Sequence, residues 1–180
     1  GSHCVVMSDP HVAGAGVTSF GKHPERTGRD LFAEAGLAAL DDAGVDPDDV
    51  GALYYGNFMG ELAEHQGHQG PLMAEAIGLD VPATRLEAAC ASAGAAIREA
   101  VKTLRNGEED VVVGGAERMT NIGTAAATDA LAIAADDLYE IRAGMTFPGA
   151  YALMARSYFE QYGGDHTDLS HIAVKNHEHA

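Results

Sequence analysis

The chain has 180 residues, of which 46% are hydrophobic, so it is long enough and apolar enough to bury a core, and the composition excludes an intrinsically disordered protein. No apolar run approaches the roughly 20 residues that a membrane-spanning helix needs, so we expect a cytoplasmic protein without a membrane partner. The net charge of −16, from 27 acidic and 11 basic residues, disfavours a nucleic-acid partner.

The first residues are expected to lie outside the folded domain. Gly1-Ser2-His3 resembles the remnant of a cleaved tag, and Met7 fits a natural start, so we expect residues 1–6 to be disordered. Cys4 lies in this segment. Cys90, the other cysteine, therefore has no disulfide partner in the folded region, which is typical of a reducing cytoplasm.

Strands and helices alternate along the first part of the chain. The helix that Thr27 opens has a capping box with Asp30 and ends at Gly44. The elements predicted before residue 80 are a strand over His11–Phe20, this helix, a strand over Val50–Phe58 and a helix over Pro71–Ile77.

The same alternation continues up to residue 118. The pattern predicts a strand over Val81–Ala88, a helix over Cys90–Asn106 and a buried strand over Asp110–Ala116. This order indicates an α/β fold with a parallel sheet over residues 7–118. After Met119 the chain becomes rich in alanine, with helices expected near residues 149–162 and 168–177, so we expect residues 119–180 to form a separate subdomain.

Cys90 is the candidate nucleophile. Small residues surround it, and it stands where an extended segment meets a helix, whose unpaired N–H groups and dipole favour the thiolate. The alternative is a cysteine that only fills space in the core.

The first turns of the Cys90 helix lack a charged face. Residues 90–97 are small or apolar apart from Ser92, which predicts a helix end that is buried all round. A single sheet covers only one side of a helix. We therefore expect another half of the protein, or a partner, to cover the other side.

Several motifs in order resemble the thiolase superfamily, specifically the N-terminal half of archaeal and sterol-carrier-protein-type acetyl-CoA C-acyltransferases. The motifs are Thr18-Ser19-Phe20-Gly21-Lys22, Gly56-Asn57, Val81-Pro82-Ala83, the Cys90 segment and Gly114-Gly115-Ala116-Glu117-Arg118-Met119. The resemblance implies a βαβαβαβ core with a buried nucleophile helix, followed over residues 119–180 by part of a helical loop subdomain that covers the substrate. It also implies a second, similar half that this chain lacks.

What the resemblance implies for Cys90 is covalent acyl transfer. In thiolases this cysteine takes up an acyl group while a carbon–carbon bond of an acyl-CoA thioester is cleaved or, in reverse, formed by Claisen condensation. The Cys90 backbone N–H would help to form an oxyanion hole. Coenzyme A thioesters are then the substrates and no cofactor is expected, and the activity would belong to lipid metabolism.

The activating residues of the family are not in this chain, since it has no Gly-His-Pro segment. We therefore expect the isolated chain to be inactive, and expect a homodimer or a hetero-assembly with a chain that carries the second half. Two alternatives stay open. One is a condensing enzyme of the ketoacyl-synthase type, and the other is a non-catalytic scaffold subunit of an acyl-CoA enzyme complex.

Other residues are weaker candidates. Met145 and Phe147 would line the acyl or pantetheine pocket, and Arg142, with Arg156 and Lys175, would meet the phosphates of coenzyme A. Packing within the subdomain, or pairing with acidic side chains, is the alternative for each. The histidine pairs at residues 65 and 68 and at 177 and 179 lack the ligand number and spacing of a closed metal site, so no metal is expected.

The acidic surface predicts a salt-loving organism. Like charges repel across such a surface in dilute buffer, whereas at molar salt the Debye length falls to about 3 Å and screens the repulsion. An ordinary acidic protein is the alternative.

Overall fold

The computed structural model describes residues 9–108 and 110–180. The segment expected to be disordered, residues 1–6, lies outside them. The chain divides into two compact units, residues 1–124 and 125–180, and each is described separately.

A parallel sheet forms the centre of the first unit. Its strands are β1 (Val50–Gly56), β2 (Ala83–Leu86) and β3 (Asp110–Gly114), in the order β2-β1-β3. Helices connect them, as parallel strands require. The α/β fold class with a parallel sheet is therefore confirmed.

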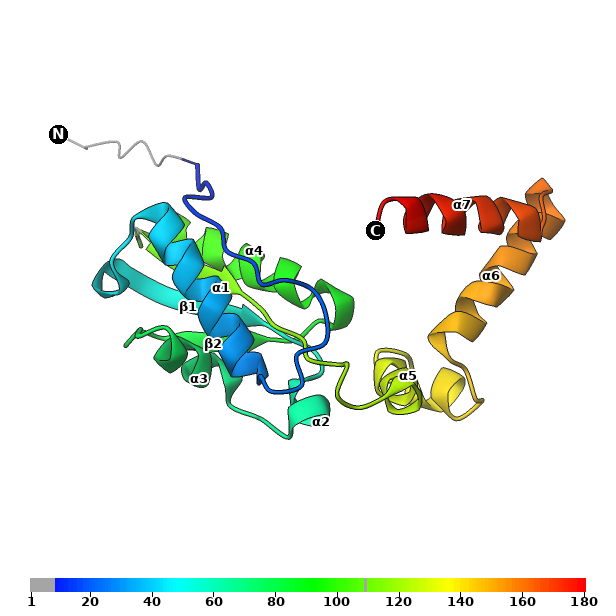
Figure 1. Ribbon diagram of the computed structural model, residues 1–180, viewed down its shortest axis with the longest axis horizontal. Helices are drawn as coiled ribbons and strands as arrows, with labels where there is room; N and C mark the ends of the chain where they lie inside the picture. The colour runs from blue at the N-terminus through cyan, green and yellow to red at the C-terminus, as the bar shows by residue number, and fades with distance from the viewer. Residues whose placement is uncertain (1–8, 109) are drawn as a thin grey trace. The chain divides into compact units, whose positions relative to one another are not determined.

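Helices cover both faces of the sheet (Figure 1). Tyr54 and Tyr55 of β1 point to opposite faces, because side chains alternate along a strand. The Tyr54 hydroxyl lies 2.7 Å from the Thr103 hydroxyl of α4 (Ser92–Arg105), which places α4 on one face. Tyr55 packs edge-on against Phe32 of α1 (Gly28–Ala43), which places α1 on the other face together with α3 (Gln69–Ala76).

The core lies on the α1 and α3 side of the sheet. Its buried members include the aromatic pair and apolar side chains of β1 and α3. They are Phe32, Leu40, Val50, Leu53, Tyr55, Met73, Ala74, Ile77 and Leu79. This packing fixes the strands, and with them the loops at their ends.

Local chemistry sets the ends of α1 as predicted. The Thr27 side chain accepts from the Asp30 backbone N–H, and the Asp30 carboxylate accepts from the Thr27 backbone N–H at 2.8 Å. The helix ends at Gly44, whose left-handed φ of 66° suits a residue without a Cβ. The predicted capping box and helix end are confirmed.

The strand predicted over residues 11–20 is wrong, because this segment pairs with no strand in the described part of the chain. It lies on α1 instead. A Cβ at Gly14 would come within 2.5 Å of the Ala39 carbonyl oxygen, and one at Gly16 within 2.1 Å of that of Ala35. Small residues let the backbone approach a helix closely, while the apolar side chains of Val12 and Phe20, 85% and 97% exposed, have no sheet to pack on.

The second unit is helical. It contains most of α5 (Thr124–Ala132), followed by a π-helical turn, η3 (Asp137–Ile141), α6 (Phe147–Tyr162) and α7 (His166–Glu178). The two later helices agree with the prediction. Neither α6 nor α7 buries a residue, and most of their large apolar side chains, such as Tyr151, Leu153 and Ile172, are exposed.

The described residues also form the short helical segments η1 (Pro47–Asp49), α2 (Gly60–Glu64) and η2 (Ala89–Ala91). Among the described residues, no helix combines the length and apolar character needed to cross a membrane.

Candidate active site

Three of the motifs noted in the sequence, Gly56-Asn57, the Cys90 segment and Gly114–Met119, lie where the three strands end. In a parallel sheet all carboxyl ends lie at one edge, which is the usual place for a site in α/β proteins. Asn57 follows β1, Cys90 follows β2 and Glu117 follows β3. The Asn57 backbone N–H donates to the Leu86 carbonyl at 3.3 Å, which links the first two of these ends.

Cys90 occupies a tight turn between β2 and α4. The prediction began the helix at Cys90, whereas the structure has the 3-10 turn η2 over residues 89–91 and begins α4 at Ser92. Ala89 has a left-handed φ of 49°, which costs roughly 1–2 kcal/mol for a residue with a Cβ. Backbone strain of this kind is common beside reactive residues.

Hydrogen bonds from neighbouring residues hold this turn and leave the backbone N–H of Cys90 free. The Ser92 hydroxyl accepts from the Ala88 N–H at 2.9 Å and donates to the Ala89 carbonyl at 2.6 Å. The Glu87 carboxylate accepts from the Ala89 N–H at 2.6 Å. In the part of the chain that the structure describes, the Cys90 N–H has no partner, so it is available to a ligand.

Cys90 is exposed, and only one face of its helix is packed. Ser92, Ala96 and Ala100 face the sheet and are buried. Ile97 on the outer face is 56% exposed. No element in the described part of the first unit covers the outer face of α4, as expected if another half or a partner covers it, and burial all round stays a prediction.

Two glycines bring the strand ends against the Cys90 turn. A Cβ at Gly56, the last residue of β1, would lie 2.7 Å from the backbone of Ala93 in the first turn of α4. A Cβ at Gly115, just after β3, would lie 2.2 Å from the Gly56 carbonyl oxygen. Both positions need glycine because the neighbouring atoms are backbone.

The loop after β1 is tied to the loop after β3 by buried polar groups. The Asn57 amide donates to the Ala116 carbonyl at 2.7 Å, and its oxygen accepts from the Gly60 N–H at 3.0 Å. The Tyr55 hydroxyl donates to the same carbonyl at 3.0 Å. Burial raises the pKa of Tyr55 above its ordinary value of 10, so this hydroxyl stays protonated and remains a donor.

Glu117 fixes the start of the same loop. Its carboxylate accepts from the backbone N–H groups of Phe58 and Met59, the latter at 3.1 Å. Met59 is buried, so its N–H has no access to water as an alternative.

Arg118 extends this connection to α1. Its guanidinium donates to the Pro24 carbonyl at 3.0 Å and lies 3.7 Å from the Glu64 carboxylate. Glu64 in turn accepts from the Gly28 N–H at 2.8 Å. The Glu117-Arg118 pair therefore holds three segments around the carboxyl edge of the sheet, a role that its sequence motif does not reveal.

Comparison with known protein families identifies the family of this chain. The model of the thiolase N-terminal domain matches residues 11–180. The chain belongs to the thiolase family. Gly56-Asn57, the Cys90 segment and the Glu117 segment are thus the parts of a thiolase domain that lie together at the Cys90 edge.

Archaeal acetyl-CoA acetyltransferases are similar to this thiolase domain along almost all of it. That of Methanothermobacter thermautotrophicus is 41% identical over 97% of this chain and 45% of its own length. That of Methanocaldococcus jannaschii is 43% identical, over 97% and 44%. The predicted resemblance to the archaeal branch is confirmed, and the chain spans less than half the length of these relatives.

A solved structure shares the fold. The Ltp2-ChsH2(DUF35) aldolase matches 84% of this chain and 38% of its own chain, with a TM-score of 0.56 and 26% sequence identity. The thiolase domain therefore again corresponds to only part of a longer protein.

The substrate residues predicted in the thiolase loop subdomain lie in the second unit. Arg142 follows η3, and its guanidinium contacts the Asp137 carboxylate at 2.8 Å and 3.0 Å while remaining exposed. Met145 and Phe147 are half-buried at the start of α6, where Thr146 caps the helix. Arg156 likewise contacts Glu160, at 3.2 Å.

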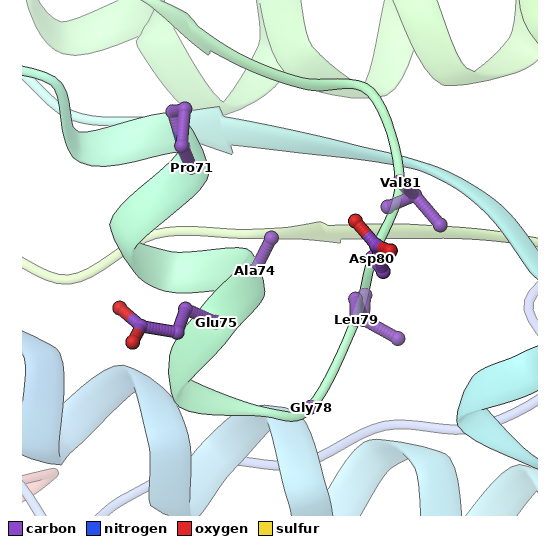
Figure 2. Close-up of a pocket in the computed structure, with 7 residues that line it drawn as sticks. All are labelled: Pro71, Ala74, Glu75, Gly78, Leu79, Asp80 and Val81. Carbon is purple, nitrogen blue, oxygen red and sulfur yellow. The ribbon is translucent and has the colours of Figure 1, made fainter.

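A hollow in the first unit lies elsewhere. It measures about 400 Å³ and lies between the end of α3 and the segment leading into β2, at the amino end of that strand, whereas Cys90 follows its carboxyl end (Figure 2). Glu75 on its rim contacts Arg29 of α1 at 2.8 Å. The hollow contains no nucleophile, so it contributes nothing to the Cys90 site.

No metal centre forms in the described ranges, since no three His, Cys, Asp or Glu side chains are grouped to hold an ion there. His65 and His68 both have left-handed backbones, at φ of 52° and 57°, at the end of α2 and the start of α3.

Proposed function

We propose that this chain supplies the nucleophile half of an acyl-CoA thiolase, with Cys90 as the residue that becomes acylated. The observation that carries the proposal is the geometry of the turn. An exposed thiol stands beside its own free backbone N–H, at the carboxyl edge of the sheet, in a chain of the thiolase family.

The chemistry follows from these two groups. The Cys90 thiolate attacks the C3 carbonyl of a 3-ketoacyl-CoA, and a sulfur–carbon bond forms. The Cys90 N–H is one donor to the oxyanion that develops on the carbonyl oxygen. The carbon–carbon bond then breaks, acetyl-CoA leaves after its carbanion takes up a proton, and the thiol of a second coenzyme A removes the acyl group from sulfur.

The general base and the proton donor would come from a second thiolase half. The open outer face of α4, with Ile97 exposed, supports this, because apolar surface beside a nucleophile is normally covered. The greater length of the relatives also supports it. The half is either a further segment of the same protein or a separate chain, in a homodimer or a hetero-assembly. The name of the Ltp2-ChsH2(DUF35) aldolase, with two components, favours the hetero-assembly.

Coenzyme A would be bound by the second unit. We assign Met145 and Phe147 to the pantetheine or acyl pocket and Arg142 to a phosphate. Arg142 is exposed and already contacts Asp137, so a phosphate would have to compete with that carboxylate. Its contribution to binding is then smaller than that of an unpaired arginine.

Protection from alkylation distinguishes this function from its alternatives. In the assembled enzyme, acetyl-CoA should protect Cys90 from iodoacetamide, and Cys4 provides an internal control because the mechanism gives it no role. A scaffold subunit would show equal labelling of Cys90 with and without acetyl-CoA. A ketoacyl-synthase-type enzyme would be acylated but would not cleave 3-ketoacyl-CoA when coenzyme A is added.

The acidic composition supports a further proposal about the environment of the enzyme. With a net charge of −16, we place it in the cytoplasm of a salt-accumulating organism, where it serves acyl-CoA and lipid metabolism.

A further inference from the structure

Ser92 is buried directly beneath the turn that carries Cys90. It is the first residue of α4, and it is 5% exposed. A Cβ at Gly56 would approach its backbone carbonyl carbon to 2.8 Å, so β1 limits any movement of Ser92 away from the turn. The hydroxyl faces two backbone groups that precede Cys90.

Those two hydrogen bonds determine the conformation of the residue before the nucleophile. The hydroxyl bridges the Ala88 N–H and the Ala89 carbonyl, on either side of the backbone rotation that gives Ala89 its left-handed φ. An alanine does not adopt this conformation readily by itself. Without the bridge, Ala89 would relax, and the Cys90 thiol and N–H would both change direction.

The bridge is one of the hydrogen bonds that occupy the backbone donors around Cys90. The Ala88 N–H is occupied by Ser92, the Ala89 N–H by Glu87, and the Ala91 N–H by the Ala88 carbonyl at 2.9 Å. Among these consecutive donors only the Cys90 N–H is left for a substrate. The free donor therefore belongs to the same residue as the exposed thiol.

We infer that Ser92 is a positioning residue for the Cys90 nucleophile, acting through its hydroxyl on the backbone of Ala88 and Ala89. This inference rests on the proposed function, because it concerns the reactivity of Cys90 as an acyl acceptor. A displacement of about 1 Å at a reacting group can reduce the rate about 100-fold.

The test compares two hydroxyl deletions on the same helix in the assembled enzyme. Ser92→Ala removes the bridge, whereas Thr103→Val removes the hydroxyl that contacts Tyr54 near the far end of α4. The measurements are the rate of Cys90 acylation by acetyl-CoA, the KM for acetyl-CoA and the melting temperature. We expect Ser92→Ala to reduce the acylation rate about 10- to 100-fold with little change in KM, and Ser92→Thr to recover part of the rate.

The outcomes separate the inference from the function on which it rests. If wild-type Cys90 is acylated and Ser92→Ala is acylated at the same rate, the positioning role is refuted and the thiolase function stands. Equal losses of the acylation rate in Ser92→Ala and Thr103→Val would show that Ser92 only stabilises the fold, and would also overturn the inference. If wild-type Cys90 accepts no acyl group, the proposed function itself fails, and the role of Ser92 fails with it.

Discussion

Substitution of Gly56 by alanine tests how closely the sheet supports the Cys90 turn. The added Cβ would lie 2.7 Å from the Cα and backbone N of Ala93 and 2.8 Å from the carbonyl carbon of Ser92. These contacts are about 0.7 Å short of ordinary van der Waals distance, and backbone atoms cannot turn aside, so α4 must move away from β1. Overpacking of this kind costs about 1–3 kcal/mol.

Gly94→Ala is the matched control, since a Cβ at this position of the same helix meets nothing within 4 Å. It should leave the free energy of unfolding unchanged or raise it by up to about 1 kcal/mol, because alanine is the better helix former. Urea denaturation of the chain, followed by circular dichroism, measures both variants. Equal stability of Gly56→Ala and wild type would refute the close packing of β1 against the Cys90 turn.

Three further predictions concern the frame around the site. Glu117→Ala leaves the buried Met59 N–H unpaired and should lower the free energy of unfolding, measured by urea denaturation, by about 1–3 kcal/mol. The control Glu99→Ala removes an exposed contact to Lys102 and should lower it by less than about 1 kcal/mol. Equal losses in the two variants would contradict the Glu117 contact. Hydrogen bonds from the Thr27 backbone and hydroxyl hold the pKa of Asp30 below its ordinary value of 3.8. The contribution of Asp30 to stability is therefore present above pH 3.8 and is lost as the pH falls through the lower pKa of the folded state. Asp30→Asn should reduce the loss of stability at acid pH, and a stability profile against pH that is the same as in wild type would contradict this role of Asp30. Thermal stability should rise from low to multimolar salt as repulsion within the −16 charge is screened, and a melting temperature indifferent to salt would exclude the halophilic interpretation.

Features that depend on neighbouring residues could be predicted from the sequence. The Thr27 and Asp30 capping box and the left-handed Gly44 are examples, because the groups that form them are at most a few residues apart. The order of strands and helices also follows from local periodicity, and it fixes the parallel sheet. Because Cys90 directly follows a predicted strand of that sheet, its place at the carboxyl edge could also be predicted.

Features that depend on distant partners could not be predicted. Residues 11–20 have the composition of a strand, but a strand needs a partner, and this segment packs on α1 through Gly14 and Gly16. The contact between Glu117 and the Phe58 and Met59 backbone joins residues that are 58 or 59 positions apart.

The 3-10 turn at Cys90 could not be predicted from the run of small residues either. A run of small residues is compatible with a regular helix from Cys90, and only the hydroxyl of Ser92 and the left-handed Ala89 distinguish the observed 3-10 turn. A serine two residues after the nucleophile was the signal, since short hydroxyl side chains often bond to nearby backbone at helix starts.

Mass analysis of the peptide that contains Cys90 tests the central claim most directly. After incubation of the assembled enzyme with acetyl-CoA, rapid acid quenching and proteolysis, we predict one acetyl group on Cys90 in wild type and none at this position in Cys90→Ser. Addition of coenzyme A should remove the acetyl group from the wild-type enzyme. An unmodified Cys90 under these conditions, or an acetyl group carried by a different residue of the chain, would contradict the assignment of Cys90 as the thiolase nucleophile.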